Sequence, residues 1–165
     1  MTFLQAIFPL AALYFVLFAA ISDLHSMRIP NWISLALLAL FAIAIPFGVF
    51  PNLAGNLIVF GAAVVILGAL YLTGVAGGGD VKLLAVLALW VGTSGIIPFL
   101  LVMSFMGGVM AAVGLVLVKN ESLKKHAFKW TDSWLARIAR GEKVVAYGVA
   151  IAVGFIAALT KTYLS

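Results

Sequence analysis

Two aspartates lie beside hydrophobic segments of this chain and could act as a catalytic pair. Asp23 stands in the stretch SDLHSMRIPN, and Asp80 follows three glycines in VAGGGDVKLL. Two carboxylates at hydrogen-bonding distance cannot both ionise easily, so they share one proton. The ionised acid then serves as general base on a bound water, while the protonated acid polarises a carbonyl and later donates to the leaving amine. Such a pair would cleave a peptide bond without a metal, a cofactor or a covalent intermediate.

Each aspartate also has a purely structural explanation. Asp23 could end one helix and Asp80 could cap the next, a role worth about 0.5–2 kcal/mol. Insertion permits both, since an aspartate costs about 2.5–3.5 kcal/mol at the bilayer centre and less near its surface. The run Gly77, Gly78 and Gly79 favours the functional interpretation. Glycine in a helix or strand costs roughly 0.5–1 kcal/mol relative to alanine, so this run predicts backbone conformations closed to other residues. It would also let a substrate strand approach the main chain.

The composition is that of an integral membrane protein. Of the 165 residues, 65% are hydrophobic and only 9% are charged, whereas a soluble domain carries about 25% charged residues. The length suggests a single domain over residues 1–165. The absence of cysteine excludes disulfides and a cysteine nucleophile. A basic soluble module for nucleic acid is also lacking, as are HExxH, P-loop and Ser–His–Asp motifs, so we expect neither a metal nor a cofactor.

Hydrophobic runs predict an all-α fold with about six transmembrane helices. The uncharged stretch 83–118 is too long for one crossing, because a helix of that length would measure roughly 54 Å. The sequence GTSG at 92–95 is the expected break. The segment before it is too short to span alone unless the bilayer thins or water reaches its end. Asn31 is expected to cap the second helix, and the first run is interpreted as a retained helix rather than a signal peptide. The runs cover about residues 3–21, 32–50, 53–72, 80–91, 96–118 and 144–159.

Lysines and arginines predict the orientation of these helices. Seven of the ten lie in the connection 119–143, which the positive-inside rule places in the cytoplasm. Counting back crossing by crossing puts Asp23, Asp80, Arg28 and Lys82 near the same face, with both chain termini outside. The seven are Lys119, Lys124, Lys125, Lys129, Arg137, Arg140 and Lys143.

The connection 119–143 also carries apolar residues at helical spacing, namely Ala127, Trp130, Trp134 and Ile138. With basic residues between them, they predict an amphipathic helix lying on the inner membrane surface, in contact with lipid.

These motifs resemble the type IV prepilin leader peptidases, which are aspartic membrane proteases with a GxGD signature. GGGD at 77–80 matches that signature, SDLHSMRIPN is similar to the first aspartate motif, and YGVAIAVG at 147–154 is similar to the last helix. The resemblance implies the GxGD protease fold, with Asp23 and Asp80 as the catalytic pair. It also implies a place in the cell inner membrane and a role in pilus biogenesis. The substrate would be a prepilin with a short basic leader and an apolar helix after the cut.

The chain departs from that family pattern in two respects. Ala146 stands where a proline often precedes Tyr-Gly, so the start of the last helix could be less rigid. The cysteine-bearing cytoplasmic domain of the longer, bifunctional enzymes is also missing, so we expect cleavage without N-methylation of the new N-terminus. The short length resembles the peptidases of tight-adherence (Flp-type) pili.

Several residues near these motifs have two interpretations. Lys82 and Arg28 could shape the site or bind the substrate, but anchoring at the headgroups by snorkelling is the simpler explanation and the one we favour. Small residues recur every four positions on the last helix, which predicts a close packing face. They are Ala146, Ala150, Gly154 and Ala158.

Two other functions fit parts of the sequence. A small transporter or ion-pathway protein could also use paired intramembrane acids and a broken helix. The uncharged connections at 50–53 and 92–95 and the clustering of both acids toward one face argue against it. A noncatalytic pilus-assembly subunit is the other alternative, and the intact GGGD argues against that.

Overall fold

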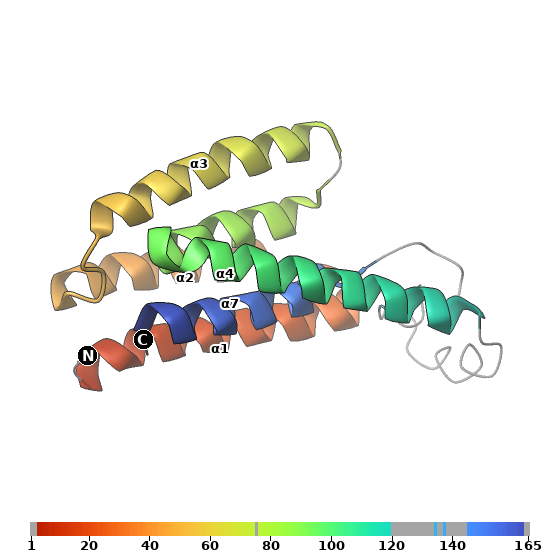
Figure 1. Ribbon diagram of the computed structural model, residues 1–165, viewed down its shortest axis with the longest axis horizontal. Coiled ribbons are helices and arrows are strands. Elements are labelled where there is room, and N and C mark those ends of the chain that lie inside the picture. Colours follow the sequence, from red (N-terminus) through yellow and green to blue (C-terminus); the bar gives the residue numbers. More distant parts are fainter. Residues whose placement is uncertain (1–2, 75, 120–133, 135–136, 138–144, 164–165) are drawn as a thin grey trace.

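Every described element of the computed structural model is a helix (Figure 1). The structure describes residues 3–74, 76–119, 134, 137 and 145–163. The all-α prediction is confirmed for this part of the chain. The predicted amphipathic connection lies outside the described residues, apart from its first residue, Trp134 and Arg137. The elements are α1 (Phe3–Ser26), α2 (Asn31–Ala44), the 3-10 helix η1 (Ile45–Phe47), α3 (Leu53–Leu72), α4 (Gly78–Lys119) and α7 (Tyr147–Tyr163).

The break predicted at 92–95 is confirmed at its first residue. Gly92 has φ 56° and ψ −160° inside α4, and the halves before and after it run in opposite directions, side by side (Figure 1). The side chain of Asn56, from α3, is inserted at this point. Its Nδ2 donates to the carbonyl of Leu89 at 2.7 Å, one of the last-turn carbonyls that a helix leaves unpaired. The break is therefore held by a buried amide as well as by a glycine.

Successive helices run back and forth along the long axis of the bundle (Figure 1). The end of α1 and the start of α4 consequently lie at one end of the bundle, and the start of α1 and the end of α7 lie at the other. Counting crossings along the sequence likewise placed the end of the first helix and the start of the fourth at one face. Which end faces the cytoplasm stays a prediction.

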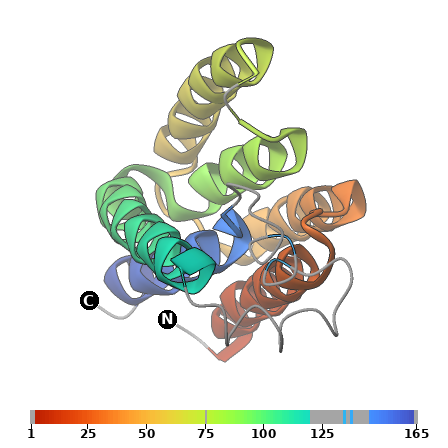
Figure 2. The ribbon, with the colours of Figure 1, turned by 90° about the vertical axis from the view of Figure 1, so that its right-hand side faces the viewer.

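The core is built around α7, which packs on both α4 and α1. Figure 2 shows α3 at the outside of the bundle, where it packs against α4. The predicted small-residue face of α7 is confirmed. Ala146, Ala150 and Ala158 are fully buried, and a Cβ on Gly154 would lie 2.8 Å from the carbonyl oxygen of Phe99. The largest fully buried side chains include Trp90, Phe99, Phe155, Ile33, Leu37, Leu83 and Leu87.

Three of the described helices are long and apolar enough to cross a membrane, which supports an integral membrane protein. They are α1, α3 and α4. The apolar segments Asn31–Phe47 and Tyr147–Thr162 are shorter. Six crossings and the sidedness therefore stay predictions.

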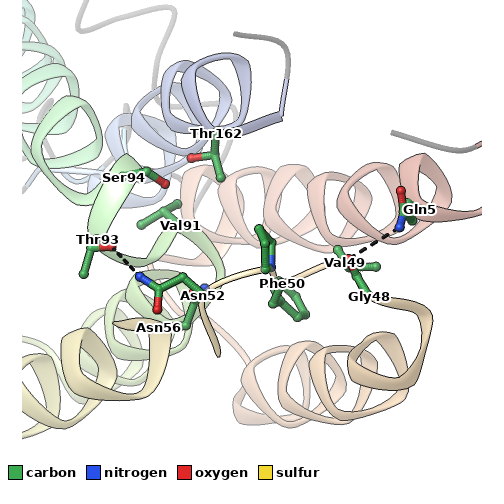
Figure 3. A pocket seen from close by; sticks show the side chains of 11 residues that line it. Gln5, Gly48, Val49, Phe50, Asn52, Asn56, Val91, Thr93, Ser94 and Thr162 are labelled. Carbon is green, nitrogen blue, oxygen red and sulfur yellow. Dashed lines mark hydrogen bonds between the residues drawn. The ribbon is translucent and has the colours of Figure 1, made fainter. Parts of the chain in front are cut away.

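A polar pocket of about 250 Å³ lies at the break in α4, and we call it the distal pocket (Figure 3). Amide and hydroxyl side chains contribute to its wall, and Asn52 Nδ2 lies 3.4 Å from Thr93 Oγ1. A polar pocket of this size can hold water. Water could thus reach the end of the first half of α4. Either this access of water or a thinner bilayer was expected from the sequence, because this half is too short to span the membrane alone. The polar lining residues are Gln5, Asn52, Asn56, Thr93, Ser94 and Thr162.

The break in α4 makes a prediction about stability. Alanine at Gly92 would have to adopt a positive φ, with its Cβ 2.7 Å from Asn56 Oδ1. We expect Gly92→Ala to lower stability by at least about 1–3 kcal/mol, measured as a lower melting temperature in detergent. Gly61→Ala is the matched control, because a Cβ there meets no atom within 4 Å. An equal effect of the two substitutions would contradict this account of the break.

Candidate active site

Asp23 and Asp80 line the same open pocket, which has a volume of about 640 Å³ and is called here the acid pocket. It is bounded by the end of α1, residues 27–31, residues 77–80 at the start of α4, and Val145 just before α7. The structure thus brings together the two acids that the sequence singled out.

Asp23 is held by the start of α7. Its side chain is buried, with 5% of the residue exposed, and Oδ2 accepts a hydrogen bond of 2.8 Å from the backbone N–H of Gly148. Gly148 is the second residue of α7, and N–H groups in a first helical turn have no partner within the helix. The partial positive charge of a helix N-terminus also favours a carboxylate there.

Position 148 must be a glycine for this contact to form. A Cβ there would lie 2.8 Å from Asp23 Cβ and 3.2 Å from Ala20 Cα. The sequence interpretation missed Gly148, because it assigned residues 147–154 only to helix packing and to a family resemblance. A signal was present in the sequence, since glycine at the start of an apolar helix lowers helix propensity and needs a reason.

Asp80 lies in the first turn of α4, and it does not cap the helix. The helix begins at Gly78, two residues before the acid, and its first turn is closed by a 3.1 Å bond from Val81 N–H to the carbonyl of Gly77. The structural explanation of Asp80 as an N-cap is therefore wrong, as is the expectation that the helix starts at the acid.

The three glycines before Asp80 serve close packing, and the predicted special backbone conformation is wrong. None of them has a positive φ, whereas Gly48, Gly74 and Gly92 do. Each would place a Cβ about 3.1 Å from a neighbour: Gly77 from Asp80 Oδ2, Gly78 from the ring of Tyr71, and Gly79 from the carbonyl oxygen of Ile29. The last contact presses the glycine motif directly against the motif that contains Asp23.

The segment after Asp23 turns sharply at Met27. This residue has φ 52°, a region that residues other than glycine seldom adopt, and its N–H donates to the carbonyl of Asp23 at 2.8 Å. Ser22 Oγ then donates to the carbonyl of Arg28 at 2.9 Å. The turn directs Ile29 toward Gly79, while Arg28 is exposed and lines the acid pocket.

Lys82 bonds to the protein at this end of the bundle. Its Nζ donates to Asn31 Oδ1 at 3.1 Å, which ties α4 to the first residue of α2. Asn31 does not cap α2 as predicted, because the cap position is Pro30 and no side chain caps the helix. Lys82 is not among the residues that line the acid pocket. Its bond to Asn31 was not among the interpretations made from the sequence.

Comparison with known protein families decides between the broad functions left open by the sequence. A model of the type IV leader peptidase family matches residues 10–112, more than half of the chain. The chain belongs to the type IV leader peptidase family. Membership implies a peptidase that acts on prepilin-type leaders. Searches of curated proteins and of solved structures each found no match.

The family match covers both aspartate motifs of this leader peptidase and ends before α7. Gly148, which provides the hydrogen bond to Asp23, is therefore outside the matched region. Among the described residues, no group of three or more His, Cys, Asp or Glu side chains could hold a metal ion. The carboxylates of the acid pocket are those of Asp23 and Asp80, and Ser22, Ser26, Arg28 and Asn31 also line it.

The contact between Gly148 and Asp23 makes a prediction about activity. The Cβ of Gly148→Ala would push the start of α7 away from Asp23, and a displacement of about 1 Å can cost about 100-fold in rate. We expect cleavage of a leader-bearing prepilin to fall by about that factor, measured on purified enzyme by gel or mass spectrometry.

Gly108→Ala is the control for this prediction, because a Cβ at that position meets no atom within 4 Å. Full activity of Gly148→Ala would show that the close approach of α7 to Asp23 does not matter for catalysis.

Proposed function

We propose that this member of the leader peptidase family is an aspartic endopeptidase, with Asp23 and Asp80 as its catalytic residues. It would remove the short basic leader from type IV prepilin-like substrates. The observation that carries the proposal is that Asp23 and Asp80 line one pocket. Family membership supports the reaction class, and the pocket supports the choice of these two residues.

The hydrogen-bond arrangement suggests different roles for the two acids. Asp23 Oδ2 accepts from Gly148 N–H, so the shared proton has its place on one of the other three carboxyl oxygens. We assign the ionised state to Asp23, which takes a proton from the attacking water, and the protonated state to Asp80, which hydrogen-bonds the scissile carbonyl. The water oxygen adds to the carbonyl carbon. When the tetrahedral intermediate collapses, the C–N bond breaks, the amine takes a proton from the pair, and one proton stays shared.

The position of the acid pocket suits a substrate that is partly embedded in the membrane. The pocket lies at helix ends, between residues 27–31 and 77–80, rather than in the middle of the bundle. A leader outside the bilayer and an apolar helix within it would meet at such a site. The positive-inside rule favours the cytoplasmic face of the cell inner membrane for this end.

The described core supports a peptidase over an ion pathway. A transporter needs a polar route between the two sides, and the acid pocket and the distal pocket would be its two ends. Along the first half of α4 between them, Leu83, Leu87 and Trp90 are fully buried. The proposal extends to a pilin of the tight-adherence (Flp) type as the substrate and to a new N-terminus that stays unmethylated.

The proposal predicts that each catalytic aspartate is needed for cleavage. Asp23→Asn and Asp80→Asn remove the shared proton system while keeping side-chain shape. We expect each to lower the rate of leader removal by at least about 100-fold, with membrane insertion and melting temperature little changed. The assay is cleavage of a purified prepilin with its leader in detergent.

Asp132→Asn removes the same charge from an aspartate that the sequence assigns to the connection 119–143, and we expect it to be fully active. Normal processing by either Asp23→Asn or Asp80→Asn would end the proposal. Ion flux without cleavage would favour the transporter instead.

A further inference from the structure

A second, smaller apolar cluster lies at the same end of the bundle as the acid pocket. Its buried members are Trp134, with 6% of the residue exposed, and Ala146, which is fully buried. The cluster is separate from the main core and draws on three parts of the fold: the end of α1, the second half of α4, and the residue that precedes α7. The partly buried side chains packed against it are Leu24, Met27, Met110 and Leu117.

This cluster adjoins both partners of the hydrogen bond to Asp23. Leu24 directly follows Asp23 in the chain, and Ala146 is two residues before Gly148. The bond joins residues 125 positions apart, so its geometry depends on how the end of α1 is held against the start of α7. Trp134 is the large buried side chain of the cluster to which the end of α1 and the residue before α7 both contribute.

We propose that Trp134 is a positioning residue for the acid pair. It forms one apolar cluster with side chains from the end of α1, the second half of α4 and the residue before α7, and thereby holds the Gly148 N–H on Asp23 Oδ2. Tryptophan suits this role, because its rigid ring buries a large area and loses little conformational freedom. This inference rests on the proposed function and adds a residue far from both aspartate motifs.

Two features next to Trp134 support such a role. Ala146 occupies the position where the family resemblance leads one to expect a proline, whose ring would fix the backbone before the last helix. Here the residue is fully buried, so packing supplies the restraint. Met27 has φ 52°, a conformation that costs about 1–2 kcal/mol for an L-residue other than glycine. The contact of its side chain with the cluster helps to offset that cost.

Trp134→Ala and Trp134→Phe test the proposal on the full chain, with a leader-bearing prepilin as substrate. Loss of the indole should lower kcat by about 10- to 100-fold through misplacement of Asp23, with KM changed by less than about twofold. Trp134→Phe should recover most of kcat, since its ring refills much of the space. Leu115→Ala is the control, because Leu115 lies exposed on the same half of α4 and outside the cluster.

A spin-label measurement gives a readout that does not depend on activity. The chain has no cysteine, so single labels can be placed at the exposed positions Ile21 on α1 and Tyr147 on α7. The distribution of distances between the two labels should broaden in Trp134→Ala and stay narrow in Trp134→Phe and Leu115→Ala. Broadening in a protein that never cleaves prepilin would support the packing role while refuting the proposed function.

The proposal is overturned if Trp134→Ala keeps the kcat of the unsubstituted enzyme, even at a lower melting temperature, because Trp134 would then be merely structural. It is also overturned if KM rises while kcat stays constant, since Trp134 would then contribute to substrate binding. Should Trp134→Ala fail to fold, Trp134→Leu removes less of the side chain and is judged by the same two measurements.

Discussion

The site depends on the hydrogen bond between the backbone N–H of Gly148 and the carboxylate of Asp23. It is 2.8 Å long, it is buried, and it joins the last turn of α1 to the first turn of α7. A helix N-terminus can stabilise a buried carboxylate because its free N–H groups and its dipole both point at the charge. The other contacts at this end of the bundle hold α1, α4 and α7 in the positions that this hydrogen bond requires.

Glycines allow the backbones of these helices to approach closely, and this close approach holds α1, α4 and α7 together at the site. Gly148 lets α7 reach Asp23, and Gly79 lets the start of α4 press on Ile29. The second contact brings Asp80 to the same pocket. At the far end, the break at Gly92 sets the length of the first half of α4 and is held by Asn56. Contacts at both ends of the first half of α4 thus hold the helix that carries Asp80. A catalytic site needs such rigid support.

The sequence predicted the parts of this structure that are local or periodic. The break at Gly92 followed from helix length and glycine content, and the small-residue face of α7 followed from its four-residue spacing. The placement of Asp23 and Asp80 at the same end of the bundle followed from topology, because an even number of reversals returns the chain to that end. Each of these predictions needs only the pattern within one segment or the number of segments between two residues.

What the sequence did not predict depends on contacts between distant segments. The glycines before Asp80 suggested an unusual backbone, but they lie in ordinary conformations against Ile29, Tyr71 and Asp80. Asn31 suggested a helix cap, but it accepts from Lys82 instead. The contact of Gly148 with Asp23 and the burial of Trp134 in its cluster involve neighbours that lie far away in the sequence. A propensity describes what a residue permits, whereas the neighbours that pack against it decide which permitted role it takes.

If Asp23 and Asp80 act as a catalytic pair, their side chains must face one another at one surface of the membrane. Because the chain contains no cysteine, Asp23→Cys and Asp80→Cys can be combined and treated with a short bifunctional thiol reagent in membrane vesicles of known orientation. We expect a cross-link between the two positions, identified by mass spectrometry, and modification of both thiols by an impermeant reagent from the cytoplasmic side alone. Modification of the two thiols from opposite sides, or no cross-link even with prepilin present, would contradict the account.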